Sequence, residues 1–140
     1  MPSAIDRVVR EGYQVFVLYD QKTQSKVELV PLLGGNIVSF TKFINGQWVE
    51  LIAAPPTLET LIDLPTRWGN GVLFPYPGRV SNDQFVYRGR QITLPKDPTT
   101  GNAIHGLIRR RGWEVIESGV SKCGEVWILL RIGTDLSNIS

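Results

Sequence analysis

Short apolar runs separated by turn-forming residues recur along the chain and predict strands rather than helices. Residues 13–20, YQVFVLYD, are rich in aromatic and β-branched side chains, which suit a pleated and partly buried surface. Within residues 36–52, two apolar runs flank Asn45-Gly46, the strongest short signal for a β-hairpin. Further strands are predicted at residues 26–32, on either side of Arg88-Gly89-Arg90, on either side of a break within 103–118, and at 125–133. This pattern is typical of an all-β protein, an antiparallel β-sandwich or barrel.

Three segments depart from the strand pattern. Residues 1–12 are polar and are expected to fray or to cap the domain. Residues 53–66 hold Pro-Pro and then a short apolar run, which predicts one helical turn that Pro65 ends. Residues 67–83, RWGNGVLFPYPGRVSND, are rich in glycine and proline and show no period, which predicts an ordered loop with a short strand. Loops of this kind often carry function.

Composition limits the classes of function. The 140 residues fit one domain, spanning 1–140, and their net charge of +2 is too small to indicate a nucleic-acid or membrane partner. No stretch approaches the roughly eighteen consecutive apolar residues of a membrane span, and the N-terminus lacks the apolar core of a signal peptide, so we expect a cytoplasmic protein. One histidine and one cysteine cannot build a zinc or two-histidine iron site, and nucleotide-binding glycine motifs are absent. We therefore expect no metal and no cofactor.

His105, the only histidine, lies within GNAIHG and is the residue of this chain with the most potential for catalytic chemistry. Imidazole titrates near neutral pH and can donate or accept a proton. The neighbouring Gly106 lets a backbone or a ligand come close. Judged from spacing alone, the alternative is a neutral histidine that is hydrogen-bonded within a β-sheet, and this alternative is the more common one.

Three arginines, Arg67, Arg79 and Arg109, lie close to glycine, proline or histidine in these atypical segments. A guanidinium offers a rigid fork of donors to hydroxyl, carboxylate or phosphate groups. The alternative is that each braces a loop or pairs with a surface carboxylate, and the run of residues 109–111 is typical of a solvated face. Trp68 is the one tryptophan that we retain as a platform for the apolar face of a sugar.

Taken in order, several motifs resemble the aldose 1-epimerase, or galactose mutarotase, family over residues 13–132. GGNIVSF resembles the early glycine pair and following strand of the family, and NGVLFPYPGRVSN resembles its FP…GR segment. QFVYRGRQITLP resembles the next hairpin, and GNAIHG resembles the N..HG motif. Each motif is weak alone, but the ordered set is specific. It favours a functional His105 over a histidine that is only hydrogen-bonded within a sheet.

The resemblance implies that the fold is an antiparallel β-sandwich, part of a mutarotase-like supersandwich. It also implies an activity that interconverts the α and β anomers of a hexose without a cofactor. In that family a base removes the anomeric hydroxyl proton and an acid protonates the ring oxygen, so that the ring opens and recloses on either face. His105 matches the family histidine that hydrogen-bonds the sugar near its ring oxygen. Arg79, Arg67, Arg109 and Asn82 become candidate substrate ligands.

The chain departs from the family in three ways. The second histidine and the glutamate base of the family lie further along, whereas this chain has one histidine, so it looks like the N-terminal portion of a family member. Asp83 stands where many mutarotases carry a sugar-binding arginine, and Asn82 matches the residue before it. HGLIR and RWGN resemble the hexose-6-phosphate epimerase branch, in which Arg67 and Arg109 would hold phosphate. That branch has glutamine where Ile104 stands.

Alternatives for ligand, function and assembly therefore stay open. The partner is a hexose or a hexose phosphate, and the protein is either a mutarotase-like isomerase or a non-catalytic carbohydrate-binding β-sandwich. Half of a supersandwich would leave an apolar face and open strand edges, which favours self-association or pairing with a missing C-terminal half. A purely structural domain would leave residues 67–82 and His105 apart, whereas the mutarotase interpretation requires both to face one cleft.

Overall fold

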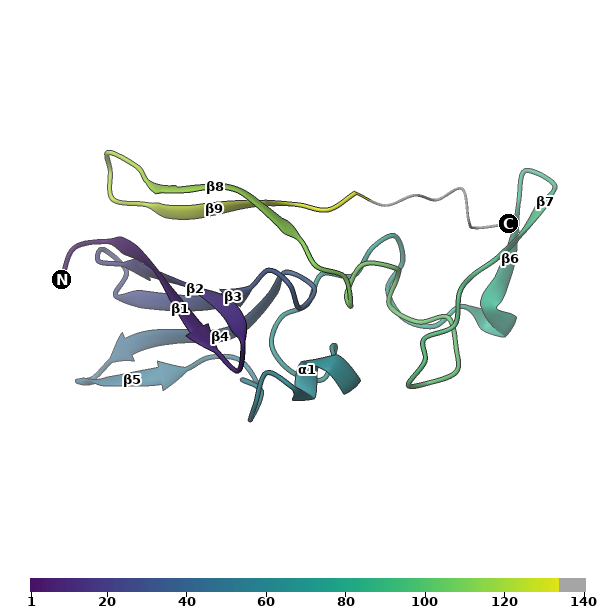
Figure 1. The fold of residues 1–140 in the computed structure, drawn as a ribbon, viewed down its shortest axis with the longest axis horizontal. Coiled ribbons are helices and arrows are strands. Elements are labelled where there is room, and N and C mark those ends of the chain that lie inside the picture. Colours follow the sequence, from purple (N-terminus) through teal and green to yellow (C-terminus); the bar gives the residue numbers. More distant parts are fainter. Residues whose placement is uncertain (134–140) are drawn as a thin grey trace.

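A five-stranded antiparallel sheet forms the body of the protein in the computed structural model, which describes residues 1–133. Consecutive strands pair in chain order, so the sheet is a simple meander (Figure 1). Its strands are β1 (Ala4–Arg10), β2 (Tyr13–Asp20), β3 (Ser25–Val30), β4 (Asn36–Ile44) and β5 (Gln47–Glu50). The predicted hairpin between β4 and β5 is confirmed, because Asn45 and Gly46 both have the positive φ, 52° and 86°, that its tight turn requires.

The expectation for residues 1–12 is wrong, because this segment contains β1. The strand pairs with β2 along its whole length, from Ala4 opposite Tyr19 to Arg10 opposite Tyr13. It lies at the edge of the sheet, and most of its side chains are exposed. Backbone hydrogen bonds rather than buried side chains hold it in place, and for that reason no alternating apolar pattern marks it in the sequence.

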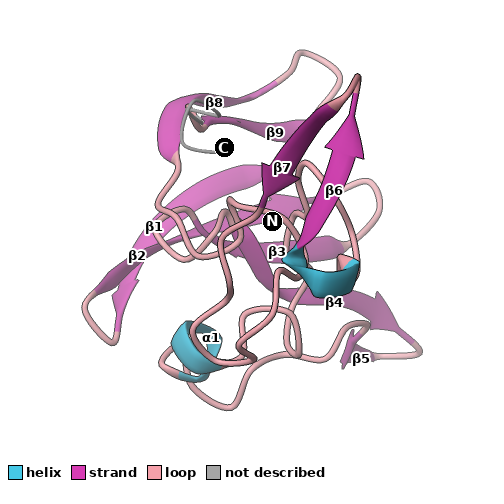
Figure 2. Ribbon diagram, turned by 90° about the vertical axis from the view of Figure 1, so that its right-hand side faces the viewer, coloured by secondary structure: helices cyan, strands magenta, loops and turns pink. Residues whose placement is uncertain are grey.

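Two further hairpins complete the strands of the described chain. One consists of β6 (Gln84–Tyr87) and β7 (Arg90–Thr93), and the other of β8 (Glu114–Val120) and β9 (Val126–Arg131). The first hairpin extends away from the sheet, whereas the second lies along β1 and β2 as a separate layer (Figures 1 and 2). The strands predicted around residues 84–95, 114–118 and 125–133 are therefore confirmed, and the fold is the predicted antiparallel all-β sandwich.

The core lies where one face of the sheet meets the segment around the short helix α1 (Thr60–Asp63). Its buried cluster combines side chains of the sheet and of that segment: Val15, Val30, Val38, Leu58 and Leu61. Trp68 packs partly buried against this cluster. The predicted single helical turn is thus confirmed, and its buried Leu61 belongs to the core cluster.

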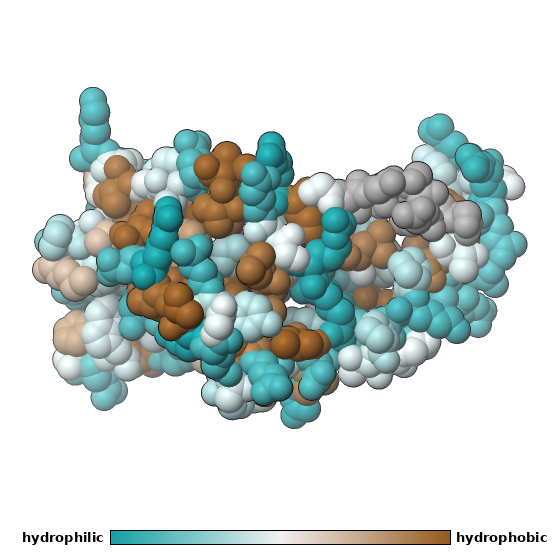
Figure 3. Space-filling view, viewed as in Figure 1, coloured by the Kyte–Doolittle hydropathy of each residue, from teal (hydrophilic) through white to brown (hydrophobic). Residues whose placement is uncertain are grey.

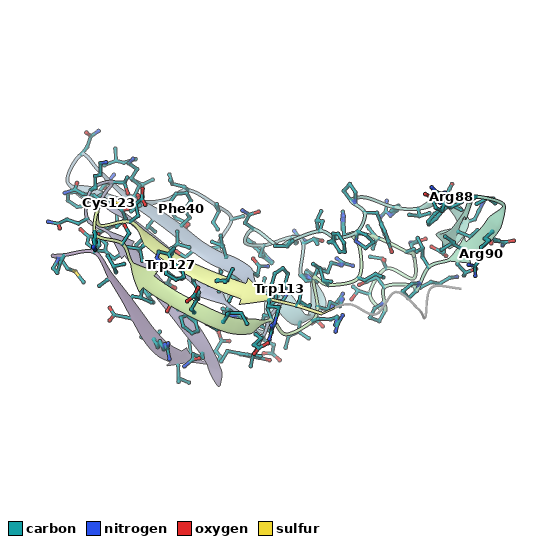
Figure 4. All side chains as sticks on the ribbon, turned by 90° about the horizontal axis from the view of Figure 1, so that it is seen from above. Phe40, Arg88, Arg90, Trp113, Cys123 and Trp127 are labelled. Atoms are coloured by element: carbon teal, nitrogen blue, oxygen red, sulfur yellow. The ribbon has the colours of Figure 1, made fainter. Side chains whose placement is uncertain are left out.

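A glycine pair lets a distant loop dock onto the sheet. The Gly34 amide donates to the carbonyl of Arg111 at 3.0 Å, and a Cβ at Gly34 would overlap the backbone of Arg109. A Cβ at Gly35 would lie 3.0 Å from the indole of Trp113, at the start of the β8–β9 layer (Figure 4). Larger residues would therefore push the loop outward, and the pair fixes how residues 105–113 sit on the body.

Apolar side chains also reach the surface of the described chain (Figure 3). On the two outer hairpins, Val86 is 70% exposed and Leu129 47% exposed. No helix among residues 1–133 is long and apolar enough to cross a membrane.

Candidate functional site

Two loops that are distant in sequence run side by side between the body and the β6–β7 hairpin. The Val80 amide donates to the carbonyl of Ala103 at 3.0 Å, and the Leu107 amide donates to the carbonyl of Phe74 at 2.7 Å. Short strands are predicted in both loops, but the structure forms only isolated bridges there, at Phe74–Gly106 and Arg79–Ile104. These predictions are wrong because glycine and proline interrupt the ladder after each bridge. The FP…GR segment and the N..HG segment nevertheless meet.

His105 stands at the centre of this junction. Its amide donates to the Gly78 carbonyl at 2.8 Å, and its imidazole Nδ1 accepts from the Gly78 amide at 3.1 Å. The two residues therefore exchange a reciprocal pair of hydrogen bonds. The φ of His105 is 60°, a left-handed conformation that costs a non-glycine residue energy and is concentrated at functional sites.

Gly106 explains how the backbone can hold His105 in this conformation. Its φ is 80°, and a Cβ there would lie 2.8 Å from the Phe74 nitrogen and overlap the Phe74 carbonyl. Only glycine allows the two backbones to approach so closely. The glycine after the histidine is therefore a packing requirement of this junction.

Positive charge surrounds the imidazole. Burial lowers the pKa of His105 from its usual value, and the charges of Arg109 and Arg79 lower it further, while Asp97 opposes them. The neutral form of the imidazole is thus favoured around neutral pH. The structure brings three predicted site residues, His105, Arg79 and Arg109, within electrostatic range of one another.

A buried ion pair underlies this junction. Asp97 is 8% exposed and Arg109 6% exposed, and Oδ2 of Asp97 accepts from Nη2 of Arg109 at 2.5 Å. Nε of Arg110 donates to the same oxygen at 2.8 Å, and the Thr99 and Thr100 amides donate to Oδ1. Burial by itself would raise the pKa of Asp97, but the hydrogen bonds from Arg110 and Thr100 and the charge of Arg109 lower it to about 2.

Arg109 is therefore already engaged within the protein. Besides Asp97, its guanidinium donates from Nη1 to the hydroxyl of Thr66 at 3.2 Å. Thr66 immediately precedes Arg67 in the chain, so this bond ties the loop that carries Arg67 to the His105 segment. The arrangement matches the loop-bracing alternative for Arg109.

The other candidate ligands present their side chains to solvent. Arg79 is exposed, and its backbone pairs with Ile104, next to His105. Arg67 is also exposed and lies over the ring of Trp68, with 5.9 Å from Cζ to the ring centre. Within residues 1–133 neither guanidinium has an ion-pair partner at 4.0 Å or less. Arg67 is connected to the His105 segment through the bond from Arg109 to the neighbouring Thr66.

Asn82 is exposed in a short 3-10 turn, Ser81–Asp83, and has a φ of 54°. The adjacent Asp83 accepts from the Ala103 amide through Oδ1 at 2.5 Å and pairs with Lys96 at 3.3 Å. The carboxylate that stands in the expected arginine position therefore joins the two loops. Backbone hydrogen bonding to Ala103 and the charge of Lys96 hold the pKa of Asp83 below its usual value.

Sequence reasoning missed Asp97 and Tyr76. The run DPTTG marks Asp97 as a turn residue, but nothing in the sequence indicates that two arginines a dozen residues away converge on it. Tyr76 lies in the FP…GR segment, and its hydroxyl is buried without a hydrogen-bond partner among the described residues. Burial raises the pKa of Tyr76, so the phenol is a neutral group near the charges of Arg109 and Asp83.

A small cavity of about 140 Å³ lies behind the junction. Its lining combines residues of the 95–98 loop with residues after the histidine, including Lys96, Asp97, Ile104, Gly106 and Arg109. Among residues 1–133, no three His, Cys, Asp or Glu side chains are grouped so that they could hold a metal ion. His105, Arg79 and Arg67 do not line this cavity. The junction itself offers a half-buried imidazole and an exposed guanidinium, which can hydrogen-bond a polar organic ligand.

These features define an antiparallel β-sandwich protein in which a histidine and an arginine lie on two facing loops. A model of the aldose 1-epimerase family matches residues 17–132, which is most of the chain. The chain therefore belongs to the aldose 1-epimerase family.

Two solved structures share the fold, and one curated protein is similar over part of the sequence. Over 98% of its length the chain superposes on a galactose mutarotase-like protein from Clostridium acetobutylicum, with a TM-score of 0.82 and 20% identity. A GalM/aldose epimerase homologue from Caenorhabditis elegans matches over 82% of the chain, with a TM-score of 0.52 and 16% identity. The uncharacterised protein YihR of Escherichia coli strain K12 is 34% identical over 56 residues, or 39% of the chain. The chain spans 40%, 32% and 18% of these three proteins, respectively.

Proposed function

We propose that the chain provides the sugar-orienting part of a mutarotase-like site, at which a hexose is bound for interconversion of its α and β anomers. The observation that carries the proposal is the junction of the FP…GR and N..HG segments. There a half-buried imidazole and an exposed guanidinium, those of His105 and Arg79, come from facing loops. Membership of the aldose 1-epimerase family supports a sugar as the ligand.

His105 is the residue proposed to hydrogen-bond the sugar near its ring oxygen. Arg79 and Asn82 lie on the loop that faces it and can donate to sugar hydroxyl groups. The exposed Arg67 is proposed as a further contact for a hydroxyl or a phosphate group. A direct contact from Arg109 stays a prediction, and its bonds to Asp97 and Thr66 favour a bracing role instead.

Ring opening needs one group that takes a proton and one that gives a proton. The chain contains a single histidine, whereas the resemblance implies two histidines and a glutamate in the family site. We therefore propose sugar binding as the property of this chain and full turnover as the property of a site that holds all three groups. Self-association as a means of completing the site stays a prediction.

The test combines sugar binding with mutarotation. Isotope-labelled chain is titrated with D-glucose and D-galactose by NMR, and the anomeric proton signals of freshly dissolved α-D-glucose are followed with and without protein. We expect saturable shifts at residues 74–80 and 103–107, and loss of affinity in His105→Ala and Arg79→Ala. Arg88→Ala is the matched control, because Arg88 is an exposed arginine at the distant end of the β6–β7 hairpin (Figure 4).

The outcomes separate the interpretations. Shifts without acceleration of mutarotation support a binding half-site, which is also the behaviour of a non-catalytic carbohydrate-binding sandwich. Acceleration that disappears in His105→Ala supports an isomerase that is complete in this chain or its oligomer. Absence of saturable shifts with both sugars and with glucose 6-phosphate contradicts the proposal. Stronger binding of the phosphate, lost in Arg67→Ala, would favour a hexose phosphate as the ligand.

A further inference from the structure

The hydrogen bonds of His105 determine which of its two ring nitrogens carries the proton. A backbone amide can only donate, so the nitrogen that faces it must offer a lone pair. The Gly78 amide lies 3.1 Å from Nδ1 of His105. In the neutral imidazole the proton therefore resides on Nε2, because one ring nitrogen carries a hydrogen and the other does not.

The surrounding backbone holds the His105 ring in this orientation. The His105 amide donates to the Gly78 carbonyl at 2.8 Å, so the imidazole and the backbone of one residue both bind the same partner. The bridge between Arg79 and Ile104 continues the pairing on one side, and the contact of Gly106 with Phe74 fixes the other. Rotation of the ring would break the Nδ1 bond while the backbone stayed in place.

The second ring nitrogen is left for a ligand. Within residues 1–133, Nε2 of His105 has no hydrogen-bond partner in the protein, and the side chain is only half-buried. The positive charges of Arg79 and Arg109 near the ring disfavour a second proton on it, and the negative charge of Asp97 opposes them. Near neutral pH the ring is thus a neutral donor.

We propose that the Gly78 amide is the positioning group that fixes His105 as the Nε2–H tautomer, so that the imidazole presents a hydrogen-bond donor, and not a base, to a sugar oxygen. The sugar in this statement rests on the proposed function, whereas the tautomer rests on the protein geometry alone. Gly78 acts through His105 and does not itself touch the sugar.

Because His105 is the only histidine, its tautomer can be measured without assignment of other rings. Long-range ¹H–¹⁵N correlation spectra are recorded at about pH 8, above the ordinary histidine pKa of about 6.5. We expect a pyrrole-type shift at Nε2 and a pyridine-type shift at Nδ1 in the chain without sugar. A pyrrole-type shift at Nδ1, or the averaged shifts of a ring that exchanges freely between tautomers, overturns the proposal.

Two amide substitutions separate the two nitrogens. His105→Asn places its amide group near the position of Nδ1, whereas His105→Gln extends its amide group toward the position of Nε2. Hydrogen exchange of the Gly78 amide should be about tenfold faster in His105→Ala, the equilibrium equivalent of one lost hydrogen bond. His105→Asn should restore that protection, and His105→Gln should not. Unchanged exchange in His105→Ala contradicts the role of Gly78.

Sugar titrations of the same variants test the second half of the proposal. His105→Gln should keep part of the affinity for D-glucose or D-galactose, and His105→Asn should lose about as much as His105→Ala. The reverse order contradicts donation from Nε2. If no sugar binds the wild-type chain, the proposed function fails, while the tautomer and exchange results still decide the role of Gly78.

Discussion

Gly106→Ala is the substitution that most directly tests how the histidine junction is built. The added Cβ would overlap the Phe74 carbonyl and lie 2.8 Å from the Phe74 nitrogen, closer than Cβ atoms approach backbone in folded proteins. Both atoms belong to the backbone, so no side chain can rotate away to make room. The two loops must separate, or the peptide between His105 and Gly106 must turn.

The size of the effect can be worked out by comparison with Gly101→Ala. Both glycines have positive φ, 80° at Gly106 and 69° at Gly101, but a Cβ at Gly101 meets nothing within 4 Å. The left-handed conformation costs alanine about 1–2 kcal/mol, and the stiffer unfolded chain offsets about 0.4–1 kcal/mol of this. Gly101→Ala should therefore cost about 1 kcal/mol. Overpacking adds about 1–3 kcal/mol at Gly106, for a total of about 2–4 kcal/mol.

Thermal unfolding followed by circular dichroism measures the two variants side by side. At about 4 °C per kcal/mol for a domain of this size, Gly101→Ala should lower Tm by about 4 °C and Gly106→Ala by about 8–16 °C. The imidazole signals of His105 should move only in Gly106→Ala. Equal losses of Tm in the two variants, with the His105 signals unchanged in both, would refute the claim that close backbone packing fixes the histidine.

Three further predictions concern the charges and the glycine pair. The pKa of Asp97 is about 2 in the folded chain against 3.8 ordinarily, so the ion pair stabilises the fold above about pH 4 by about 2 kcal/mol. Urea unfolding should show this stability being lost between about pH 4 and pH 2 in the wild type and not in Asp97→Asn. Arg79→Gln should raise the pKa of His105 in an NMR titration, because one of the charges that lowers it is removed; an unchanged or lower pKa would contradict the electrostatic contact. Gly34→Ala should lower Tm by more than Gly46→Ala, because a Cβ at Gly34 meets the Arg109 backbone whereas a Cβ at Gly46 meets nothing within 4 Å; equal losses would contradict docking through the glycine pair.

Local signals in the sequence were sufficient for most of the fold. Asn45-Gly46 specifies a turn by its backbone conformation, and Pro65 stops a helix by its missing amide, so both predictions depend on neighbouring residues alone. Residues 1–12 were mispredicted for the opposite reason. That segment is a strand because β2 supplies its hydrogen-bond partners, and an edge strand with exposed side chains carries no pattern of its own.

The motif resemblance led us to expect that the segments of His105 and Arg79 meet, and the structure brings them together. The roles of both residues toward a ligand stay predictions. The motif resemblance could not reveal that Arg109 is buried against Asp97, because this ion pair depends on where the 95–100 loop lies in the folded protein. Gly78 could not be predicted either, because its contact with His105 is made by the backbone amide, which every residue except proline carries.

We expect the buried ion pair and the exposed arginines to have separate roles. Moving Arg109 to a ligand would leave the buried carboxylate of Asp97 with Arg110 as its one remaining cation among the described residues. Breaking a buried pair costs up to about 3–5 kcal/mol, whereas a single hydrogen bond from a guanidinium to a neutral sugar hydroxyl contributes about 1.5–3 kcal/mol. Arg67 and Arg79 have no such bond to break within the described residues. Arginine contacts to a bound sugar should therefore come from these two side chains, while Arg109 holds the loop that supports His105.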